Sequence, residues 1–396
     1  MRLYLLLLLC VIGGSSIVFG QTIVRDTIRH SALDRSYILY IPSNYQATEN
    51  WPLVMLLHGG GQGNGESLLE QLQFHEVADT ANFLCLYPNG FDNQWADGRG
   101  VTTPDVAGVD DVQFLNDLLD SIALDYPFDA ANVFVTGGSN GGMMTQRLAC
   151  ETPNTFRAYA TMIASMPDPV HASCAPGTTV NMLLMNGTED ILVPYDGGSL
   201  HPLTDGGSVL GTDATIAFWK DNNSCTTNSQ VLDFENTDLT DGSTVHLTQY
   251  RNCTDSSKVV LYRVEGAGHT IPGMVANMNP RPIVGYTNYD IVAALEIWRF
   301  FKSHLIPPII NNIPVEDVEH SVQLYPNPTN GTVFIRGLEG ELQFQIDVLD
   351  VNGKVLLESN DGQALELATL PDGLYYVRVV LPERAYTLPL IMSAQD

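Results

Sequence analysis

The sequence predicts an α/β fold followed by a small all-β sandwich. From Tyr37 to about Phe301, short β-rich apolar runs alternate with helical stretches, which is typical of a mostly parallel sheet with helices on both faces. Beyond residue 320 the runs become short and alternating, and the Asn-Gly and Asp-Gly pairs between them favour tight hairpins. With 396 residues, of which 44% are hydrophobic, the chain can build buried cores in more than one domain.

The expected strands of the first domain are short apolar runs at 37–41, 53–57, 83–87, 133–136, 158–163, 182–185 and 259–264. Apolar residues three or four positions apart predict helices over 111–124 and 143–150. A further helix over 288–304 closes the domain. Because strands and helices alternate along the chain, most neighbouring strands are expected to be parallel.

The second domain is expected over residues 321–396, after a linker at 306–320 that contains a Pro-Pro pair. Its expected strands lie at 332–336, 343–349, 354–357 and 375–380. It contains no cysteine and no histidine beyond His320 at its edge. We therefore expect any chemistry to reside in the first domain, residues 21–305.

Residues 1–20 have the organisation of a secretory signal peptide. Arg2 precedes an apolar run, and small residues follow that run, so cleavage is expected near Gln21. We expect the mature protein to be exported. No later stretch has the roughly 18 uninterrupted apolar residues that a membrane span needs, so no span is expected in the mature protein.

The charge of the chain argues against nucleic acid as a partner. Lys and Arg total 18 against 45 Asp and Glu, and the formal net charge of -27 repels phosphate backbones. The glycine-rich stretch after His58 lacks both the Lys-Ser or Lys-Thr pair of a phosphate loop and the glycine spacing of a dinucleotide site. Nucleotides are therefore not expected as ligands.

Five cysteines remain after the expected cleavage, so at least one is unpaired. Export makes disulfides reasonable, and the short-range pairs are Cys150 with Cys174 and Cys225 with Cys253, although other pairings are possible. Cys85 lies in an apolar run typical of a buried strand, where a free thiol behaves as a small hydrophobic group.

The clearest chemical motif is a G-x-S-x-G sequence centred on Ser139. It follows the strand expected at 133–136 and precedes a helix that begins near Gly142. A serine on such a tight strand-to-helix turn is held exposed above the sheet, and the glycines permit the strained turn. Ser139 is therefore the candidate nucleophile.

A serine nucleophile needs a histidine to accept its proton and a carboxylate to orient that histidine. The acid should follow a later strand, and the loop after 182–185 offers Glu189, Asp190 and Asp196. We choose Asp190, because Asp196 lies in a sequence more typical of a turn. The histidine should follow the last strand, and His269 lies in the glycine-rich loop after 259–264.

A tetrahedral intermediate also needs backbone amides to bind its oxyanion. The residue after the nucleophile, Asn140, can supply one, and Gly60 in the His-Gly-Gly-Gly loop after strand 53–57 is the best candidate for the other. No metal-binding sequence pattern is present, and no cofactor is expected. Asp105, Asp110 and Asp111 are interpreted as a solvated acidic face rather than a calcium site.

Six segments carry a family resemblance: LHGGGQ at 57–62, YPNG at 87–90, VDDV at 109–112, GGSNGGMM at 137–144, VPY at 193–195 and GHT at 268–270. Together they resemble the secreted α/β-hydrolase esterases grouped as polyhydroxybutyrate depolymerase-like and feruloyl or acetylxylan esterases. The resemblance extends over roughly residues 30–304. It implies the triad Ser139, Asp190 and His269.

The same resemblance implies disulfides between Cys150 and Cys174 and between Cys225 and Cys253. It leaves two substrate classes open, plant cell-wall esters and hydroxyalkanoate polymers, and the expected export suits both, because neither polymer enters a cell. We favour feruloyl or acetyl esters on xylan, with polyhydroxybutyrate as the alternative. A non-catalytic binding or adhesion protein on the same fold is the alternative from another class.

One departure from the family concerns the substrate pocket. Related sequences often carry tryptophan after the His-Thr pair, where this chain has Ile271. The smaller side chain favours acetyl or other aliphatic esters over feruloyl groups. Trp95 is the candidate aromatic residue that could bind substrate instead, with a packing role as its alternative.

The second domain has a resemblance of its own. The segments LYPNPTNG at 324–331 and LPDGLYYV at 370–377 are similar to the sorting domains recognised by the type IX secretion system. This implies secretion machinery as a partner and transport across an outer membrane. The chain lacks the basic tail usual in such domains. A carbohydrate- or polymer-adhesion module is the alternative.

Overall fold

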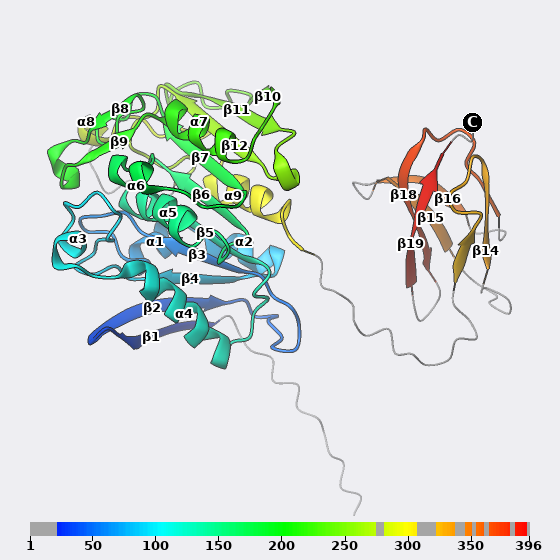
Figure 1. Cartoon of the computed structure of the whole chain (residues 1–396), viewed down its shortest axis with the longest axis horizontal. Coiled ribbons are helices and arrows are strands. Elements are labelled where there is room, and N and C mark those ends of the chain that lie inside the picture. The colour runs from blue at the N-terminus through cyan, green and yellow to red at the C-terminus, as the bar shows by residue number, and fades with distance from the viewer. Residues whose placement is uncertain are drawn as a thin grey trace, which may run out of the picture. The chain divides into compact units, whose positions relative to one another are not determined.

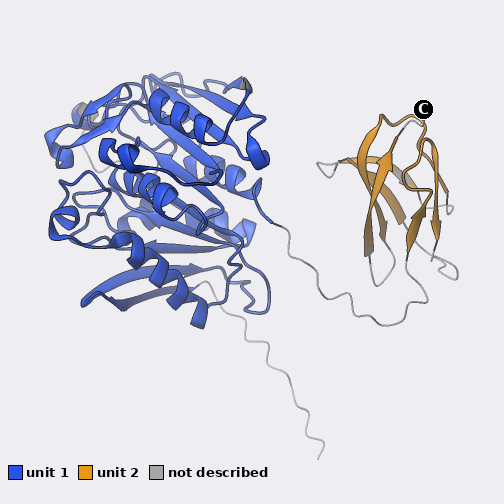
Figure 2. Cartoon of the chain, viewed as in Figure 1, with its two compact units in different colours: residues 1–308 blue, residues 309–396 orange. Residues whose placement is uncertain are grey.

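The structure, a computed structural model, describes residues 22–274, 281–306, 322–336, 345–350, 354–359, 364–380 and 385–393. The chain forms two units, residues 1–308 and 309–396 (Figure 2). The predicted signal peptide at 1–20 lies outside the described residues, as does nearly all of the predicted linker at 306–320.

A ten-stranded sheet forms the centre of the first unit, in the order β1-β2-β4-β3-β5-β6-β7-β12-β11-β10 (Figure 1). The strands are β1 (Thr22–His30), β2 (Leu33–Ile41), β3 (Leu53–Leu57), β4 (Leu84–Pro88), β5 (Val133–Gly138), β6 (Ala158–Met162), β7 (Met182–Gly187), β10 (Thr227–Asp233), β11 (Thr244–Arg251) and β12 (Val259–Glu265). The six strands from β4 to β12 are parallel, and antiparallel strands flank them at both edges. The predicted mostly parallel sheet is confirmed.

Helices cover both faces of this sheet (Figure 1). The helices are α1 (Gly65–Leu72), α2 (Phe74–Ala81), α3 (Thr103–Ala107), α4 (Asp111–Asp125), α5 (Asn140–Glu151), α6 (Asp168–Ser173), α7 (Thr212–Asn222), α8 (Arg281–Val284) and α9 (Ala293–Lys302). Alternate strand residues enter different cores: Val54 and Leu56 pack with α1, α2 and α9, whereas Met55 packs with α4, α5 and α7. This alternation follows from the two-residue period of a strand.

The short elements of the first unit lie in its loops. They are the hairpin strands β8 (Gly197–Ser199) and β9 (Ser208–Leu210) and the 3-10 helices at Pro202–Thr204 and Thr254–Ser256.

The seven predicted strands of this unit are present, but the central sheet contains three more, β1, β10 and β11. These three lie at or next to the sheet edges and mix polar with apolar residues, so they lack the apolar runs that identified the buried strands. The prediction of a helix over 288–304 is wrong at its start, because α9 begins at Ala293. Asn288 Oδ1 accepts the backbone amides of Asp290 and Ile291, which holds this segment in a loop.

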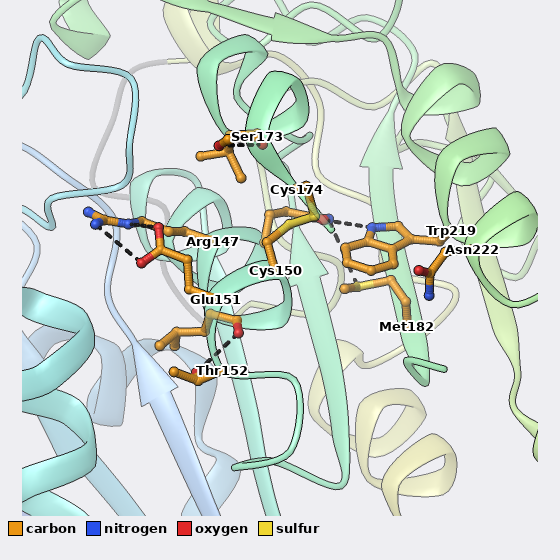
Figure 3. The surroundings of a disulfide bond; sticks show 12 residues. Arg147, Cys150, Glu151, Thr152, Ser173, Cys174, Met182, Trp219 and Asn222 are labelled. Atoms are coloured by element: carbon orange, nitrogen blue, oxygen red, sulfur yellow. Dashed lines mark hydrogen bonds and ion pairs between the residues drawn. A yellow bond between two sulfur atoms is a disulfide. The ribbon is translucent and has the colours of Figure 1, made fainter. Parts of the chain in front are cut away.

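Two disulfides join elements of the first unit, and both implied pairings are confirmed. Cys150 at the end of α5 is bonded to Cys174 after α6, and Cys225 is bonded to Cys253. Figure 3 shows the first of these beside Trp219, a fully buried residue of α7. Cys85 is free and buried in β4, as predicted.

The second unit contains two antiparallel sheets that pack on each other. One has the order β13-β14-β17 and the other β16-β15-β18-β19. The strands are β13 (Gln323–Tyr325), β14 (Thr332–Arg336), β15 (Gln345–Leu349), β16 (Val355–Ser359), β17 (Ala364–Glu366), β18 (Gly373–Val380) and β19 (Ala385–Met392). Val333 and Ile335 from the first sheet share one core with Val348 and Val377 from the second, so the predicted all-β sandwich is confirmed.

Among the described residues, no helix has the length and apolar character that crossing a membrane requires.

We expect the double substitution Cys150→Ser and Cys174→Ser to lower the free energy of unfolding by about 3 kcal/mol. The bond closes a loop with a sequence separation of 24 residues, and its loss frees the unfolded chain. Urea unfolding followed by tryptophan fluorescence measures the change. The exposed neighbour Ser173 supplies the control variant, Ser173→Ala, which should change stability by less than about 0.5 kcal/mol. Equal midpoints for all three proteins would contradict a stabilising role for this disulfide.

Candidate active site

Ser139 lies on a sharp turn between β5 and α5. Its backbone has φ 54° and ψ -122°, a strained conformation for a residue with a side chain. The surrounding glycines are needed because the turn is crowded. A Cβ at Gly137 would lie 2.3 Å from Gly141 O, and a Cβ at Gly141 would lie 2.2 Å from Leu57 O. The Ser139 amide donates to Met162 O at 3.0 Å, which ties the turn to the end of β6.

Asp190 and His269 follow β7 and β12, which are neighbouring parallel strands. The carboxyl ends of parallel strands meet at one edge of the sheet, so their loops come together above it. His269 Nε2 lies 3.0 Å from Ser139 Oγ, and His269 Nδ1 lies 2.7 Å from Asp190 Oδ2. With Nδ1 donating to the carboxylate, the lone pair of Nε2 faces the serine hydroxyl.

Asp190 is held in place by its own loop. Its Oδ1 accepts the backbone amides of Leu192 and Val193, each at 2.8 Å. Asp196, the other acid considered for this role, lies in an exposed turn in which the Gly197 amide donates to Pro194 O. Of these two acids, Asp190 is the one hydrogen-bonded to His269.

Backbone contacts join the acid loop to the histidine loop. The Glu189 amide donates to Ala267 O at 2.9 Å, and the Gly266 amide donates to Thr188 Oγ1 at 2.9 Å. The two loops therefore form one unit, which fixes the distance between the carboxylate and the imidazole.

The loop of residues 58–61, called the glycine loop below, follows β3 and lies against Ser139. A Cβ at Gly59 would lie 3.6 Å from Ser139 Cβ, and a Cβ at Gly60 would lie 3.4 Å from Asn140 Cβ. Asn140 is the first residue of α5, and the first amides of a helix have no acceptor within the helix. The loop and the start of the helix thus bring backbone amides and the positive end of the helix dipole close to Ser139.

His58 stabilises the glycine loop from within. Its Nδ1 donates to Gly59 O at 2.7 Å, and its Nε2 accepts the Gly90 amide at 2.9 Å. Burial lowers the pKa of His58 to about 4, and this agrees with a neutral ring that donates at one nitrogen and accepts at the other.

The interpretation of Trp95 as a substrate-binding wall is wrong. Its side chain is fully buried and is not part of the pocket surface. The Trp95 indole N–H donates to His58 O at 2.9 Å, and the two rings are 5.0 Å apart. Trp95 therefore supports the glycine loop from behind, which is the packing role given as its alternative.

The interpretation of a solvated acidic face is wrong for Asp111, whereas Asp110 is exposed and Asp105 is partly exposed. Asp111 is fully buried and pairs with Arg35 at 2.6 Å, while Asp105 accepts the backbone amides of Gly98 and Gly100. Asp110 caps α4 by accepting the Gln113 amide. These acids hold loop and helix backbone in place. In the part of the chain that the structure describes, no group of three or more His, Cys, Asp or Glu side chains could hold a metal ion.

Ser139 and His269 open into a pocket of about 630 Å³. Its apolar lining comes from several loops and comprises Leu68, Met143, Ile163, Leu192, Leu203, Ile271, Met274 and Ile283. No Phe, Tyr or Trp is among the described lining residues. The pocket wall at Ile271 is therefore aliphatic, as expected from the isoleucine that this chain has where related sequences often carry tryptophan.

Most of the pocket lining was not predicted from the sequence, and Ile163 and Arg99 show why. Ile163 has φ 46°, which is strained for a β-branched residue, and it follows directly after β6. Arg99 lines the pocket and pairs with the buried Asp97. A positive φ at isoleucine leaves no trace in the sequence, and the Arg99 contacts depend on segments more than one hundred residues apart.

Two families match separate parts of the chain. Residues 35–175 match the family described as esterase PHB depolymerase, and residues 323–392 match the one described as secretion system C-terminal sorting domain. Both resemblances given from the sequence are confirmed. The esterase match contains the glycine loop and Ser139 but ends before Asp190 and His269.

Two curated relatives match less than half of this chain. A bifunctional acetylxylan esterase/xylanase of Neocallimastix patriciarum is 31% identical over 174 residues, which are 43% of this chain and 24% of that protein. Feruloyl esterase C of Emericella nidulans is 28% identical over 170 residues, which are 41% of this chain and 58% of that protein. The chain therefore spans less than two thirds of either relative.

Among solved structures, an acetyl xylan esterase from Aspergillus awamori aligns with 64% of this chain and 96% of its own, with a TM-score of 0.45 and 16% identity.

The location of the protein follows from two findings. The second unit matches a sorting domain, and the first unit carries two disulfides, which form in oxidising compartments. The protein is therefore an exported one, secreted or held at the cell surface.

We expect the imidazole of His58 to remain neutral between about pH 8 and about pH 5, because burial lowers its pKa to about 4. Nitrogen chemical shifts of the labelled ring, followed by NMR across this range, should show one protonated nitrogen, Nδ1, throughout. The ring nitrogens of His201, whose side chain is only partly buried, are followed in the same spectra and compared with those of His58. A doubly protonated His58 ring above pH 5.5 would contradict the assignment.

Proposed function

We propose that the protein is an extracellular serine esterase that hydrolyses carboxylic esters of plant cell-wall polysaccharide, of the feruloyl or acetyl xylan type. The observation that carries this proposal is the hydrogen-bonded chain from Ser139 Oγ through His269 to Asp190 at a pocket. In the proposal Ser139 is the nucleophile, His269 the general base and acid, and Asp190 the group that orients His269.

The first half of the reaction forms an acyl-enzyme. Ser139 Oγ attacks the ester carbonyl carbon while His269 Nε2 takes the hydroxyl proton. The carbonyl oxygen becomes an oxyanion, which accepts hydrogen bonds from the backbone amides of Asn140 and Gly60. The bond from the carbonyl carbon to the alcohol oxygen then breaks, and His269 gives its proton to that oxygen.

The second half releases the acid. A water molecule attacks the acyl group on Ser139 while His269 accepts one of its protons. The tetrahedral intermediate again places its oxyanion between the two amides. It collapses by breaking the bond to Ser139 Oγ, which takes the proton back from His269. Apart from the ester and the water molecule, all groups that act in this scheme belong to the chain itself.

The choice of substrate rests on the relatives and on the pocket. The names of the two curated relatives include acetylxylan esterase and feruloyl esterase. Within that class, the aliphatic lining around Ile271 and Ile163 favours an acetyl group over a feruloyl group, because neither side chain offers an aromatic face for a cinnamoyl ring. The matching part of each relative is short, so the test must include several esters.

A hydroxyalkanoate polymer is the second candidate substrate. It is favoured by the match of residues 35–175 to the family described as esterase PHB depolymerase. A non-catalytic binding protein on the same fold is disfavoured, because such a protein would have no need of the complete hydrogen-bonded chain at Ser139.

The proposal assigns a part to each segment of the chain. Residues 1–20 form a signal peptide, 21–305 the esterase domain, 306–320 a linker, and 321–396 a domain that engages secretion machinery. The last assignment is supported by the sorting-domain match at 323–392.

We expect the mature protein to hydrolyse p-nitrophenyl acetate and acetylated xylan faster than methyl ferulate or a hydroxybutyrate oligomer. Ser139→Ala should lower kcat by about 10⁴ or more on every substrate, because no nucleophile remains to form the acyl-enzyme. Initial rates of both proteins on the four esters, with thermal unfolding as a check on the fold, test this. Fastest turnover of the oligomer would favour the second candidate. Equal rates for the variant and the wild type would exclude Ser139 as the nucleophile.

We expect Asp190→Asn to lower kcat by about 10⁴, because an amide no longer holds the histidine as the tautomer that accepts the serine proton. Asp196→Asn is the matched control, since Asp196 comes from the same loop but lies in an exposed turn. Its kcat should stay within about threefold of the wild type. If Asp196→Asn is the damaging substitution, the acid has been assigned to the wrong residue.

A further inference from the structure

We propose that Asp97 is a positioning residue that fixes Asn140 and, through it, the geometry of the oxyanion site. The inference rests on the proposed function and concerns a residue that does not touch the substrate. It comes from the buried polar contacts between the loop at 95–99 and the start of α5.

The side chain of Asn140 is bonded on every side. Its Oδ1 accepts the Trp95 amide at 2.8 Å, and its Nδ2 donates to Trp95 O at 3.1 Å and to Asp97 Oδ2 at 2.6 Å. The oxygen accepts one hydrogen bond and both hydrogens of the amide nitrogen are used. Asn140 is only 4% exposed, and these three hydrogen bonds hold its side chain, and with it the start of α5, in one position.

Asp97 is the charged member of this group. Its side chain is fully buried, Oδ1 accepts the backbone and Nε hydrogens of Arg99, and Oδ2 accepts from Arg99 Nε as well as from Asn140. Burial raises the pKa of Asp97 to about 6, although Arg99 and the hydrogen bonds oppose this. At neutral pH it is therefore mostly an ionised acceptor, and charge-assisted hydrogen bonds of this kind are short and strong.

Arg99 carries the same network to the rim of the pocket. Its Nη1 donates to Thr204 O and Gly206 O, each at 2.7 Å, and Thr204 and Asp205 line the pocket near Ser139. Asp97 thus lies between the residue after the nucleophile and the segment that forms part of the pocket wall. One ion pair links the two.

The consequence for chemistry follows from how closely the two proposed oxyanion donors are packed. A Cβ at Gly60 would be in van der Waals contact with Asn140 Cβ, at 3.4 Å, so the two residues are neighbours and a shift of Asn140 moves its own amide relative to that of Gly60. Hydrogen bonds to the oxyanion act mainly in the transition state, and a misplacement of about 1 Å can cost about a hundredfold in rate. Loss of Asp97 should therefore lower kcat rather than raise KM.

Asp111 provides a matched control in the same region. Like Asp97 it is fully buried and pairs with a buried arginine, Arg35, and its Oδ2 accepts the amide of Ala96 in the same loop. Its hydrogen bonds within the described part of the chain go to Arg35 and Ala96 and not to Asn140. Both carboxylate oxygens of each acid accept hydrogen bonds from N–H groups. Substitution by asparagine replaces one of these oxygens by an amide NH2, which would then face another N–H donor. Both substitutions should therefore destabilise the fold to a similar degree.

The experiment compares Asp97→Asn with Asp111→Asn in the full mature chain, using p-nitrophenyl acetate and thermal unfolding. We expect Asp97→Asn to lower kcat about a hundredfold with KM changed less than about threefold. We expect Asp111→Asn to lose at least tenfold less in kcat at a similar loss of thermal stability. Affinity for a trifluoromethyl ketone, which forms a tetrahedral oxyanion adduct with the serine, should fall in parallel with kcat/KM for Asp97→Asn.

Asn140→Ala gives a second, independent measure, because it keeps the backbone amide and removes the side chain that Asp97 holds. It should lower kcat as Asp97→Asn does, and the double variant should be no slower than Asn140→Ala alone. Additive losses, equal kcat losses for the two acid variants, or a loss confined to KM would overturn the inference. A wild-type protein that hydrolyses no ester would instead overturn the proposed function, so the two failures are distinguishable. If Asp97→Asn does not fold, a normal kcat for Asn140→Ala still decides against the inference.

Discussion

Ser139 keeps its strained backbone because the residues around it leave no space for another arrangement. Gly137 and Gly141 are in contact with backbone that a Cβ would overlap, and the Ser139 amide is bonded to the end of β6. This fit between β3, β5, β6 and α5 fixes where the hydroxyl lies. Every other part of the site, including His269 and the glycine loop, is positioned relative to that hydroxyl. The site therefore depends on the packing of the parallel sheet and its helices rather than on the flexibility of any loop.

Two supports of different kind meet at this turn. On one side, Asp190 and His269 come from neighbouring parallel strands, so the sheet itself sets their separation, and backbone hydrogen bonds between the two loops complete it. On the other side, the glycine loop has little side-chain material of its own. It relies on His58 within the loop and on Trp95 behind it, both of them buried and hydrogen-bonded. Backbone hydrogen bonds thus hold the acid and the base, and buried aromatic rings hold the loop that carries the backbone amides. Together they give one preorganised surface around Ser139.

Much of this could be predicted from the sequence because it depends on local patterns. Apolar runs marked the buried strands, and the G-x-S-x-G motif together with the order of the later loops located Ser139, Asp190 and His269. The predictions failed where a residue's environment comes from distant segments. Trp95 and Asp111 read as exposed aromatic and acidic residues, but contacts with His58 and Arg35 bury them. The edge strands were missed because their half-exposed faces carry few apolar residues.

The use of arginine in this chain shows why the buried ion pairs are present. The protein has only 18 Lys and Arg against 45 Asp and Glu, yet Arg35 and Arg99 have side chains that are only 3% and 2% exposed, and both hold the region around the 95–99 loop. A buried ion pair often stabilises a fold no better than well-packed apolar side chains do, since both charges must leave water. What it supplies is direction, because each guanidinium N–H donates, and each carboxylate oxygen accepts, only along a few directions. Arg99, which lies where Asp97 contacts Asn140, is thus better explained by the need to orient the turn at Ser139 than by stability.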